Sequence, residues 1–336
     1  MKKGSIIKNI EYVLGSNPIE NSFFHQKFPD YNFKRFEKKV GIKKRFICDE
    51  NENIITLAIK SCNKLFEKSS VKKDDIEFLI LCTQSPEYLI PTNSCIIQDQ
   101  LGLKNCTGSF DFNLGCSGYV YGLSIAKGLI ESGQVKNVLL VTSETYSKYI
   151  NDKDLINQLI FSDASSATLI ERSEINGINN FIFGTDGSGY DKLIVKNNFF
   201  RKEFNPSNQS YANINFYNDN NLYMDGPAIF NFTIQNIPKL LNDILEKNKL
   251  QKHEVDYYIL HQANKFLLQS IRNLSKINEE KFIIDVENFG NTVSNTIPIS
   301  LKNLSLHNND KKNIILAGFG VGLSWSACKI LINNKL

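Results

Sequence analysis

Apolar residues along the chain follow two spacings, one typical of amphipathic helices and one typical of buried strands. The segment LFEKSSVKKDDIEFLIL, which begins at Leu65, contains the end of a helical pattern, a charged turn and a short apolar run. The same order recurs without a gap in ILEKNKLQKHEVDYYIL, which begins at Ile244. Such a pattern predicts an amphipathic helix that leads into a buried strand. The chain therefore contains two copies of one helix-strand unit.

Later segments extend the repeat with small shifts in offset. FDFNLGCSG parallels IDVENFGNT, which pairs Gly115-Cys116 with Gly290-Asn291, and NVLLVTSET parallels NIILAGFGV. A period of this length is too long for a solenoid. We therefore expect an α/β protein with two duplicated halves, residues 1–174 and 175–336, related by a pseudo-two-fold axis.

The ends of the paired strands point to a candidate site. In α/β sheets, ligands gather beyond the carboxyl ends of the strands, so the residues that follow the paired strands should face one cleft between the halves. These residues are Cys82, Cys116, His261, Asn291 and the Phe319-Gly320 turn. A Cys, a His and an Asn at such equivalent positions are not expected by chance.

Composition excludes several classes of protein. The 336 residues are 42% hydrophobic, which is enough apolar material for a large core. The net charge of +4 is too weak and too evenly spread to indicate nucleic-acid binding. No stretch approaches a membrane span, and Lys8 and Glu11 interrupt the first apolar residues, so we expect no secretory signal. Seven cysteines without close CxxC pairs argue against a disulfide framework or a zinc site and favour a cytoplasmic protein.

One local cluster of basic residues interrupts the even distribution of charge. Its members are Lys34, Arg35, Lys38, Lys39, Lys43, Lys44 and Arg45. A solvated basic loop explains the cluster, and so does a docking site for an acidic partner or a phosphate-bearing cofactor. Both interpretations stay open at this point.

The candidate residues suit nucleophilic catalysis. Cys116 follows a strand and opens a segment with helical spacing, where free N–H groups and the positive end of the helix dipole should favour a thiolate. His261 ends the apolar run VDYYIL, where a structural histidine is the alternative. Asn291 lies between a strand and a helix, and helix capping alone would also explain it. Only the combination of the three favours a catalytic site.

A Cys, His and Asn set also occurs in papain-like cysteine proteases. In those enzymes the nucleophile opens a helix near the mature N-terminus and lies in a different local motif. Here both halves alternate strand and helix, and the residues around Cys116 do not follow that motif. The protease is therefore a remote alternative.

At this point the sequence resembles the β-ketoacyl-[acyl carrier protein] synthase III family over nearly its whole length. The motifs that carry the resemblance are VGIKKR, TQSPEYLIPT, FDFNLGCSGYVYGL, ETYSKYINDKD, FSDASSATLI, MDGPAIFNF, HQAN, NFGNTVSNTIP and GFGVGLSW, in the family's order and spacing. The resemblance implies a thiolase fold with α-β-α-β-α layers and a homodimer in which the loop containing Ile90 reaches the neighbour's acyl pocket. It also implies a place in fatty-acid or specialised acyl biosynthesis.

The resemblance further implies a two-stage reaction. Cys116 takes an acyl group from a thioester, and a malonyl thioester then loses carbon dioxide and attacks that group. His261 and Asn291 donate hydrogen bonds to the enolate oxygen, and the N–H of Cys116 and one from Gly320 to Gly322 hold the other oxyanion. Phe319 shields the reacting carbons. An acyltransferase that forms an ester or an amide from the acyl-Cys is the alternative on the same scaffold.

Several positions depart from the family, and they concern recognition of the thioester carrier. Arg35 stands where an adenine-stacking aromatic is common, Lys39 where an arginine is common, and Phe266 where arginine is frequent. Val321 replaces the middle glycine of the last glycine-rich turn, which matters if that position needs a positive φ. The residues expected to bind substrate are Arg35, Lys39, Ile90, Gly226, Asn264 and Phe266. We expect no permanently bound cofactor or metal, substrates on coenzyme A or acyl carrier protein, and no nucleic-acid or membrane partner.

Overall fold

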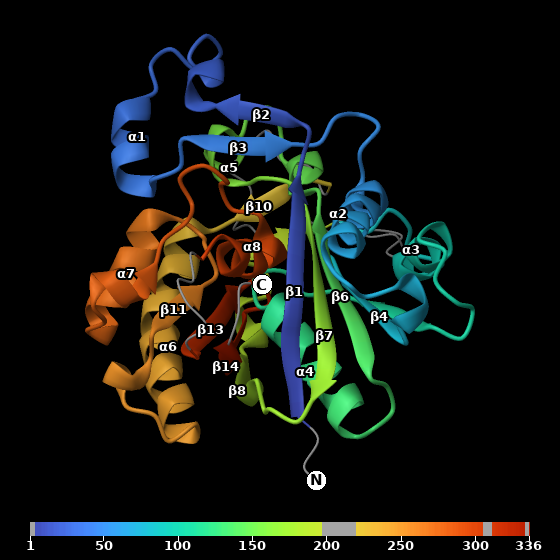
Figure 1. The fold of residues 1–336 in the computed structure, drawn as a ribbon. Helices are drawn as coiled ribbons and strands as arrows, with labels where there is room; N and C mark the ends of the chain where they lie inside the picture. The colour runs from blue at the N-terminus through green and yellow to red at the C-terminus, as the bar shows by residue number, and fades with distance from the viewer. Residues whose placement is uncertain (1–3, 197–219, 305–310, 333–335) are drawn as a thin grey trace.

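The structure is a computed structural model that describes residues 4–196, 220–304, 311–332 and 336. Two five-stranded sheets lie face to face with helices α4 (Gly118–Glu131) and α8 (Thr296–Asn303) between them (Figure 1). The outer face of the first sheet is covered by α2 (Ile54–Lys68) and α3 (Asn93–Gln100), and that of the second by α6 (Gly226–Lys247) and α7 (Lys265–Ser275). The predicted α-β-α-β-α layering is confirmed.

The two sheets repeat one strand order. The first consists of β1 (Gly4–Leu14), β7 (Ala164–Ser173), β6 (Asn137–Glu144), β4 (Phe78–Cys82) and β5 (Gly108–Phe112). The second, written in the corresponding order, consists of β8 (Ile178–Thr185), β14 (Ser324–Ile332), β13 (Lys312–Gly320), β11 (Tyr257–Leu260) and β12 (Phe282–Ile283). In each sheet the first three strands are antiparallel neighbours and the last three are parallel neighbours. The duplication seen in the sequence is thus a duplication of topology.

Two small sheets and two short α-helices lie outside these layers. The sheets are antiparallel pairs of β2 (Asn17–Glu20) with β3 (Lys44–Ile47) and of β9 (Leu193–Val195) with β10 (Leu222–Met224), and the helices are α1 (Phe33–Val40) and α5 (Leu155–Ile160). The predicted boundary between residues 174 and 175 lies in the connection from β7 to β8. The division into two domains at that point stays a prediction.

The buried apolar residues follow the layers. One cluster lies between α2, α3 and the first sheet, a second surrounds α4 between the sheets, and a third joins α6, α7 and the second sheet. The strands β4 and β11 are almost fully buried because helices cover both faces of the sheets, and this explains their unbroken apolar runs. The ends of these buried strands define where the candidate site lies.

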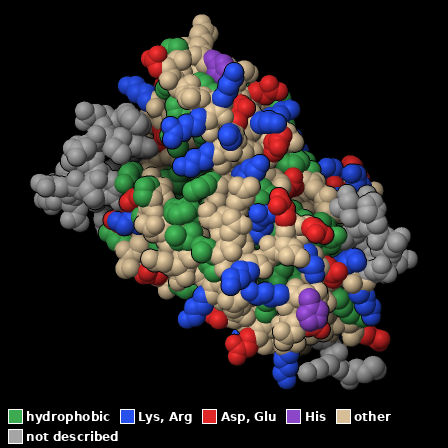
Figure 2. Space-filling model, turned by 90° about the vertical axis from the view of Figure 1, so that its left-hand side faces the viewer, with side chains coloured by type: hydrophobic (Ala, Val, Ile, Leu, Met, Phe, Trp, Pro, Cys, Tyr) green, Lys and Arg blue, Asp and Glu red, His purple; other side chains and the backbone are tan. Residues whose placement is uncertain are grey.

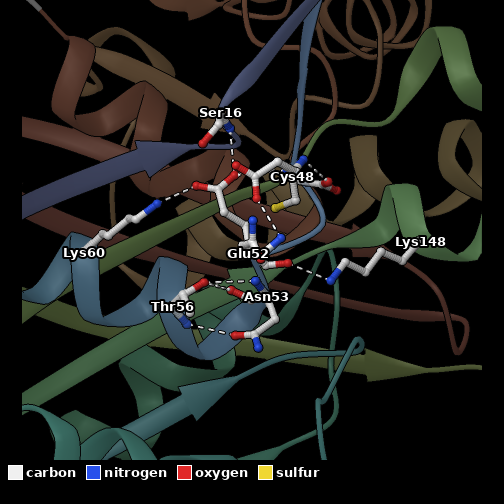
Figure 3. Close-up of polar contacts among 10 residues, drawn as sticks. Ser16, Cys48, Glu52, Asn53, Thr56, Lys60 and Lys148 are labelled. Carbon is white, nitrogen blue, oxygen red and sulfur yellow. Dashed lines mark hydrogen bonds and ion pairs between the residues drawn. The ribbon is translucent and has the colours of Figure 1, made fainter.

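Helix α2 begins at a polar corner that joins it to the first strand. Asn53 Oδ1 accepts hydrogen bonds from the N–H groups of Ile55 and Thr56, and Thr56 Oγ1 accepts one from the Asn53 N–H. The adjacent Glu52 carboxylate accepts from the Ser16 N–H at 2.9 Å and pairs with Lys60 (Figure 3). Because capping satisfies otherwise unpaired N–H groups, the helix has a defined start against the sheet.

Candidate active site

Cys116 lies in a tight elbow between β5 and α4. Gly118, the first residue of α4, lies so close to Cys82 that an added Cβ would be 2.3 Å from that sulfur. The elbow rests on the second sheet, because the Ser117 and Ser324 hydroxyls lie 2.7 Å apart and Ser326 donates to the Ser117 carbonyl. Contacts between the two halves therefore fix the position of the thiol.

The environment of Cys116 disfavours a resting thiolate. The pKa of its thiol is raised from 9.0 to about 12, first by burial and then by the nearby Glu144 carboxylate. The backbone N–H groups of Cys116 and Val321 oppose this rise because they hydrogen-bond to the sulfur. The expectation that the start of the helix makes the thiolate the favoured form is wrong, since desolvation exceeds the effect of these donors.

His261 follows β11 and faces the same region as a neutral imidazole. Burial lowers its pKa from 6.5 to about 3, and a backbone hydrogen bond with Val293 opposes the shift. Its Nδ1 lies 2.8 Å from the Thr296 hydroxyl, which leaves Nε2 as the ring nitrogen that can meet a substrate. The ring also meets Phe319 edge-on, with centroids 5.7 Å apart.

Hydrogen bonds to both its backbone N–H and its backbone carbonyl hold Asn291 in place. Its backbone N–H donates to the Ile160 carbonyl and its carbonyl accepts from the Ser162 N–H, both at 2.9 Å. The side-chain Oδ1 accepts from the Val293 N–H at 2.9 Å, so the amide NH₂ is the group left to donate. The side-chain oxygen of Asn291 is thus used by the hydrogen bond from Val293, and its amide nitrogen can donate to a substrate.

A cavity of about 420 Å³ brings the predicted catalytic residues together. Its wall includes Cys116, His261, Asn291, Phe319 and Gly320. It is otherwise lined mainly by apolar side chains from the end of α5, from α6 and from the paired strands β9 and β10, among them Ile160, Phe161, Leu193, Met224 and Ile229. An apolar cavity with a buried thiol and two neutral polar side chains suits an acyl group.

The turn after β13 resolves the question raised by Val321. Among the described residues, the non-glycine residues with positive φ are Lys249, Lys276 and Val293, so Val321 has an ordinary backbone conformation. Positive φ values occur on either side, at Gly320 and Gly322. The N–H of Val321 reaches Cys116, so the valine leaves this donor in place.

The predicted substrate-binding residues divide into two groups. Lys39, Gly226, Asn264 and Phe266 line the cavity. In the cavity wall, the Lys39 ammonium lies 4.7 Å from the centroid of the Phe266 ring. The Phe266 ring in turn stacks on Phe230, with ring centroids 5.4 Å apart. Arg35 and Ile90 are outside the described lining, and Ile90 is 84% exposed.

The basic cluster of residues 34–45 is smaller at the surface than the sequence suggested. Arg45 is fully buried, where it donates to Asn21 Oδ1 and lies over the Phe24 ring. Lys43 forms an ion pair with Glu287 at 2.7 Å. The prediction that Arg45 belongs to an exposed basic patch is wrong. The remaining cations lie on and just after α1. Figure 2 shows this face of the molecule, where basic side chains gather together with some acidic ones above a group of hydrophobic side chains.

Sequence reasoning missed Glu144, the last residue of β6. Its carboxylate is fully buried and, after burial itself, is the named cause that raises the pKa of Cys116. The signal is present in the sequence, because NVLLVTSET is one copy of the repeat and Glu144 stands at the end of its strand. Thr296, the partner of His261, was also missed.

Other kinds of site find no support in the part of the chain that the structure describes. No group of three or more His, Cys, Asp or Glu side chains there could hold a metal ion. No described helix combines the length and apolar character that crossing a membrane requires. All seven cysteines are free.

Comparisons with known proteins agree with this geometry. Residues 110–187 match the family profile described as 3-oxoacyl-[acyl-carrier-protein (ACP)] synthase III, and residues 245–332 match its C-terminal profile. The chain is 34% identical over 323 residues to "Beta-ketoacyl-[acyl-carrier-protein] synthase III" of Clostridium novyi, covering 96% of this chain and 97% of that protein. The corresponding protein of Clostridioides difficile is 32% identical over 91% of this chain and 92% of its own length.

Two solved structures are similar over almost the whole chain. A crystal structure of a 3-oxoacyl-(acyl-carrier-protein) synthase III has a TM-score of 0.91 at 37% identity, covering 98% of this chain and 100% of that one. The 3-oxoacyl-(acyl-carrier protein) synthase of Burkholderia xenovorans has a TM-score of 0.93 at 30% identity, covering 98% of this chain and 94% of that one.

Proposed function

The chain belongs to the β-ketoacyl-[acyl-carrier-protein] synthase III family of the thiolase superfamily, and we propose that it joins an acyl group held on Cys116 to the two-carbon unit of a malonyl thioester. It is a condensing enzyme of fatty-acid or related acyl biosynthesis. The observation that carries the detailed proposal is that Cys116, His261 and Asn291 share the wall of one cavity.

In the first stage the Cys116 sulfur attacks the carbonyl carbon of an acyl thioester. The carbon–sulfur bond to the carrier breaks, and the thiol proton leaves with the carrier thiolate, so the carrier departs as a free thiol. The N–H groups of Cys116 and Val321 already point at the Cys116 sulfur, and they serve as donors to the oxyanion that forms on the acyl carbonyl. A buried, protonated thiol is protected from side reactions until a thioester enters.

In the second stage a malonyl thioester loses carbon dioxide, and the electron pair of the broken carbon–carbon bond forms an enolate. The neutral His261 ring and the Asn291 amide donate to the enolate oxygen. The enolate carbon then attacks the acyl carbonyl, a new carbon–carbon bond forms, and the carbon–sulfur bond to Cys116 breaks. The Cys116 thiolate that leaves takes up a proton from solvent, which restores the thiol. Donors aimed at developing charge stabilise the transition state more than the substrate.

The donor role of His261 requires a particular tautomer. Nε2 carries the proton only if Nδ1 accepts one, so the Thr296 hydroxyl must donate to Nδ1 across 2.8 Å. The same hydroxyl lies 3.1 Å from the Val293 carbonyl, and it cannot donate to both groups at once. Binding of the malonyl thioester would select the tautomer in which Thr296 donates to His261.

The two stages separate by mutation. Cys116→Ala should abolish acyl labelling of the protein in intact-mass measurements. His261→Ala and Asn291→Ala should still accept the acyl group but lose roughly 2.7–4 kcal/mol of transition-state stabilisation in condensation, as for other oxyanion-hole donors. Ser132→Ala, at the far end of α4, is a matched control that should leave both stages unchanged. A His261→Ala variant that condenses at the wild-type rate would contradict the proposed roles.

We further propose that an acyl carrier protein delivers the acyl group. The exposed cations of α1 lie beside Lys39, which lines the cavity, and Arg35 does not supply an aromatic ring for adenine. Acidic carrier proteins gain complementary charge at such a surface, and the attraction weakens with salt.

This carrier proposal is tested by comparing kcat/KM for one acyl group on acyl carrier protein and on coenzyme A, at low and high salt. Lys38→Glu should lower kcat/KM for the carrier-bound substrate at low salt, while Lys72→Glu, on the turn between α2 and β4, should not. A preference for coenzyme A, or no salt dependence, would refute it.

A homodimer in the cytoplasm is part of the proposal. β5 is the last strand of its sheet in the described chain, and the loop before α3 exposes Tyr88, Leu89 and Ile90. An unpaired edge strand next to exposed apolar side chains favours association with a second copy. Light scattering tests the dimer, and a monomer at micromolar concentration would exclude it.

A further inference from the structure

Glu144 is a buried carboxylate that the two stages described above do not use. It ends β6, its side chain is inaccessible to solvent, and no lysine or arginine of the described residues forms an ion pair with it. Burying an unpaired carboxyl group costs free energy unless hydrogen bonds compensate. The protein keeps such a group close enough to its nucleophile to raise the pKa of the Cys116 thiol.

Hydrogen bonds from two separate segments converge on this carboxylate. Its Oε2 accepts from the Gln84 N–H and the Ser85 hydroxyl, each at 3.0 Å. Its Oε1 accepts from the Ser294 hydroxyl at 2.8 Å. The Ser85 oxygen also accepts from the Thr145 N–H at 2.9 Å, which closes the network onto the end of β6. Glu144 thus joins the segment after β4 to the segment before α8.

The segment before α8 carries the groups proposed to stabilise the enolate. Ser294 lies between Asn291 and Thr296, and Thr296 contacts the Nδ1 atom of His261. Val293, which binds the Asn291 oxygen through its N–H, directly precedes Ser294. A shift of Ser294 would therefore displace the donors on both of its sides.

The segment after β4 carries a group that packs against the nucleophile's elbow. Gln84 lies against Gly115, where an added Cβ would be 2.2 Å from the Gln84 amide oxygen. The same oxygen accepts from the Tyr146 hydroxyl at 2.6 Å. Through Gln84 and Ser294, one carboxyl group contacts both the side of the site that bears Cys116 and the side that bears Asn291.

The charge of Glu144 acts on several titratable neighbours. Burial raises its own pKa from 4.5 to about 8, hydrogen bonds from Gln84, Ser294 and Ser85 oppose the rise, and nearby Asp163 adds to it. Its carboxylate raises the pKa of Cys116, Cys82, Tyr146 and Tyr149. Once Glu144 is ionised, its charge therefore makes the Cys116 thiolate harder to form.

We propose that Glu144 is a positioning residue for the condensation: its carboxyl group holds the Asn291 and His261 side of the cavity in register with the Cys116 elbow, and its ionisation lowers the reactivity of the thiol. This inference rests on the proposed function, because positioning is defined by the enolate donors. It adds a residue that contacts neither the acyl group nor the malonyl unit.

Two conservative variants separate the positioning role of Glu144 from the effect of its charge on Cys116. Glu144→Gln keeps an oxygen for Gln84 and Ser85 and an NH₂ group for the Ser294 oxygen, so it retains the bridge and removes the charge. Ser294→Ala removes one contact of the bridge and retains the charge. Each variant is first checked by its denaturant midpoint against wild type.

The effect of charge is read from alkylation of Cys116 by iodoacetamide between pH 6 and pH 10. The thiolate is the reactive form, so the logarithm of the rate should rise with pH. In the wild type the rise should flatten near pH 8, where Glu144 ionises, and the Gln variant should lack this break. At pH 9 the Gln variant should react about tenfold faster, the equivalent of one pKa unit. If the logarithm of the alkylation rate rises with pH in the same way in the wild type and in Glu144→Gln, the proposed effect of the Glu144 charge on Cys116 is overturned.

The effect of position is read from the two half-reactions. Ser294→Ala should keep a break in the alkylation profile, moved to higher pH because the Ser294 hydroxyl no longer stabilises the Glu144 carboxylate. It should also keep the wild-type rate of acyl labelling, while its condensation with malonyl thioester falls about tenfold, roughly the effect of losing one buried hydrogen bond. Condensation at the wild-type rate would overturn positioning. If the wild-type enzyme itself forms no condensed product, the proposed function fails, and the alkylation profile still decides whether Glu144 controls the thiol.

Discussion

Gly318→Ala offers a test of how the second half of the molecule holds the nucleophile of the first. Gly318 lies on β13, directly against the Cys116 elbow. An added Cβ would be 2.6 Å from the Cys116 carbonyl oxygen and 2.7 Å from the Ser117 Cα. Both atoms belong to the backbone, so no side chain can rotate away to make room.

The structure sets the size of the effect. Ordinary contacts of a Cβ begin near 3.4 Å, so the elbow must move by several tenths of an ångström. Misplacement of about 1 Å costs on the order of 10²-fold in rate, and overpacking costs about 1–3 kcal/mol in stability. We therefore expect Gly318→Ala to acylate Cys116 up to about a hundred times more slowly and to unfold at lower denaturant concentration.

The control is Gly128→Ala, at an exposed position in the last turn of α4, where an added Cβ meets nothing within 4 Å. Alanine is favoured over glycine in a helix, so this variant should gain roughly 0.5–1 kcal/mol and acylate at the wild-type rate. The assay is the rate of acyl labelling by intact mass, with urea unfolding in parallel. A Gly318→Ala enzyme that labels as fast as wild type would refute the idea that this contact positions Cys116.

Three further predictions follow from the same geometry. Burial lowers the pKa of His261 from 6.5 to about 3, so below pH 6.5 the unfolded chain binds a proton that the folded protein does not, and wild-type stability should fall as pH drops from 6.5 toward 3. The urea midpoint of His261→Asn should fall less over that range. An equal fall in the midpoints of the variant and the wild type would count against a buried neutral imidazole. Thr296→Val removes the hydroxyl that faces Nδ1 of His261, and it should slow condensation about tenfold without slowing acylation of Cys116. The kinetics of the two half-reactions measure this, and an unchanged rate of condensation would exclude the proposed tautomer. Ile90→Ala should shift acyl labelling toward longer or branched groups if the exposed loop enters the partner's cavity, and an unchanged acyl profile would remove that loop from the site.

The fold could be predicted from the sequence because the duplication encodes it. Two copies of one helix-strand pattern fix two similar sheets, and the unbroken apolar runs of β4 and β11 indicate strands covered on both faces. The placement of Cys116, His261 and Asn291 in one cavity also follows from this pattern, because equivalent strand ends face each other across the pseudo-two-fold axis.

Other features depend on burial, which spacing along the chain does not report. Arg45 continues a basic cluster in the sequence but packs inside, against Asn21 and Phe24. Cys116 stands before a helix, yet desolvation and Glu144 keep its thiol protonated. Val321 replaces a glycine without strain because the positive φ values fall on its neighbours. In each case three-dimensional surroundings reverse or remove a local expectation.

The central claim is that the enzyme forms a carbon–carbon bond with loss of carbon dioxide, and a reaction with malonyl thioester labelled with ¹³C at its free carboxyl group tests it most directly. The account predicts that the acyl group on Cys116 disappears, that labelled carbon dioxide is released in equal amount, and that the product is a β-ketoacyl thioester two carbons longer and free of label. An acyl ester, an amide or a free acid, formed without labelled carbon dioxide, would contradict it.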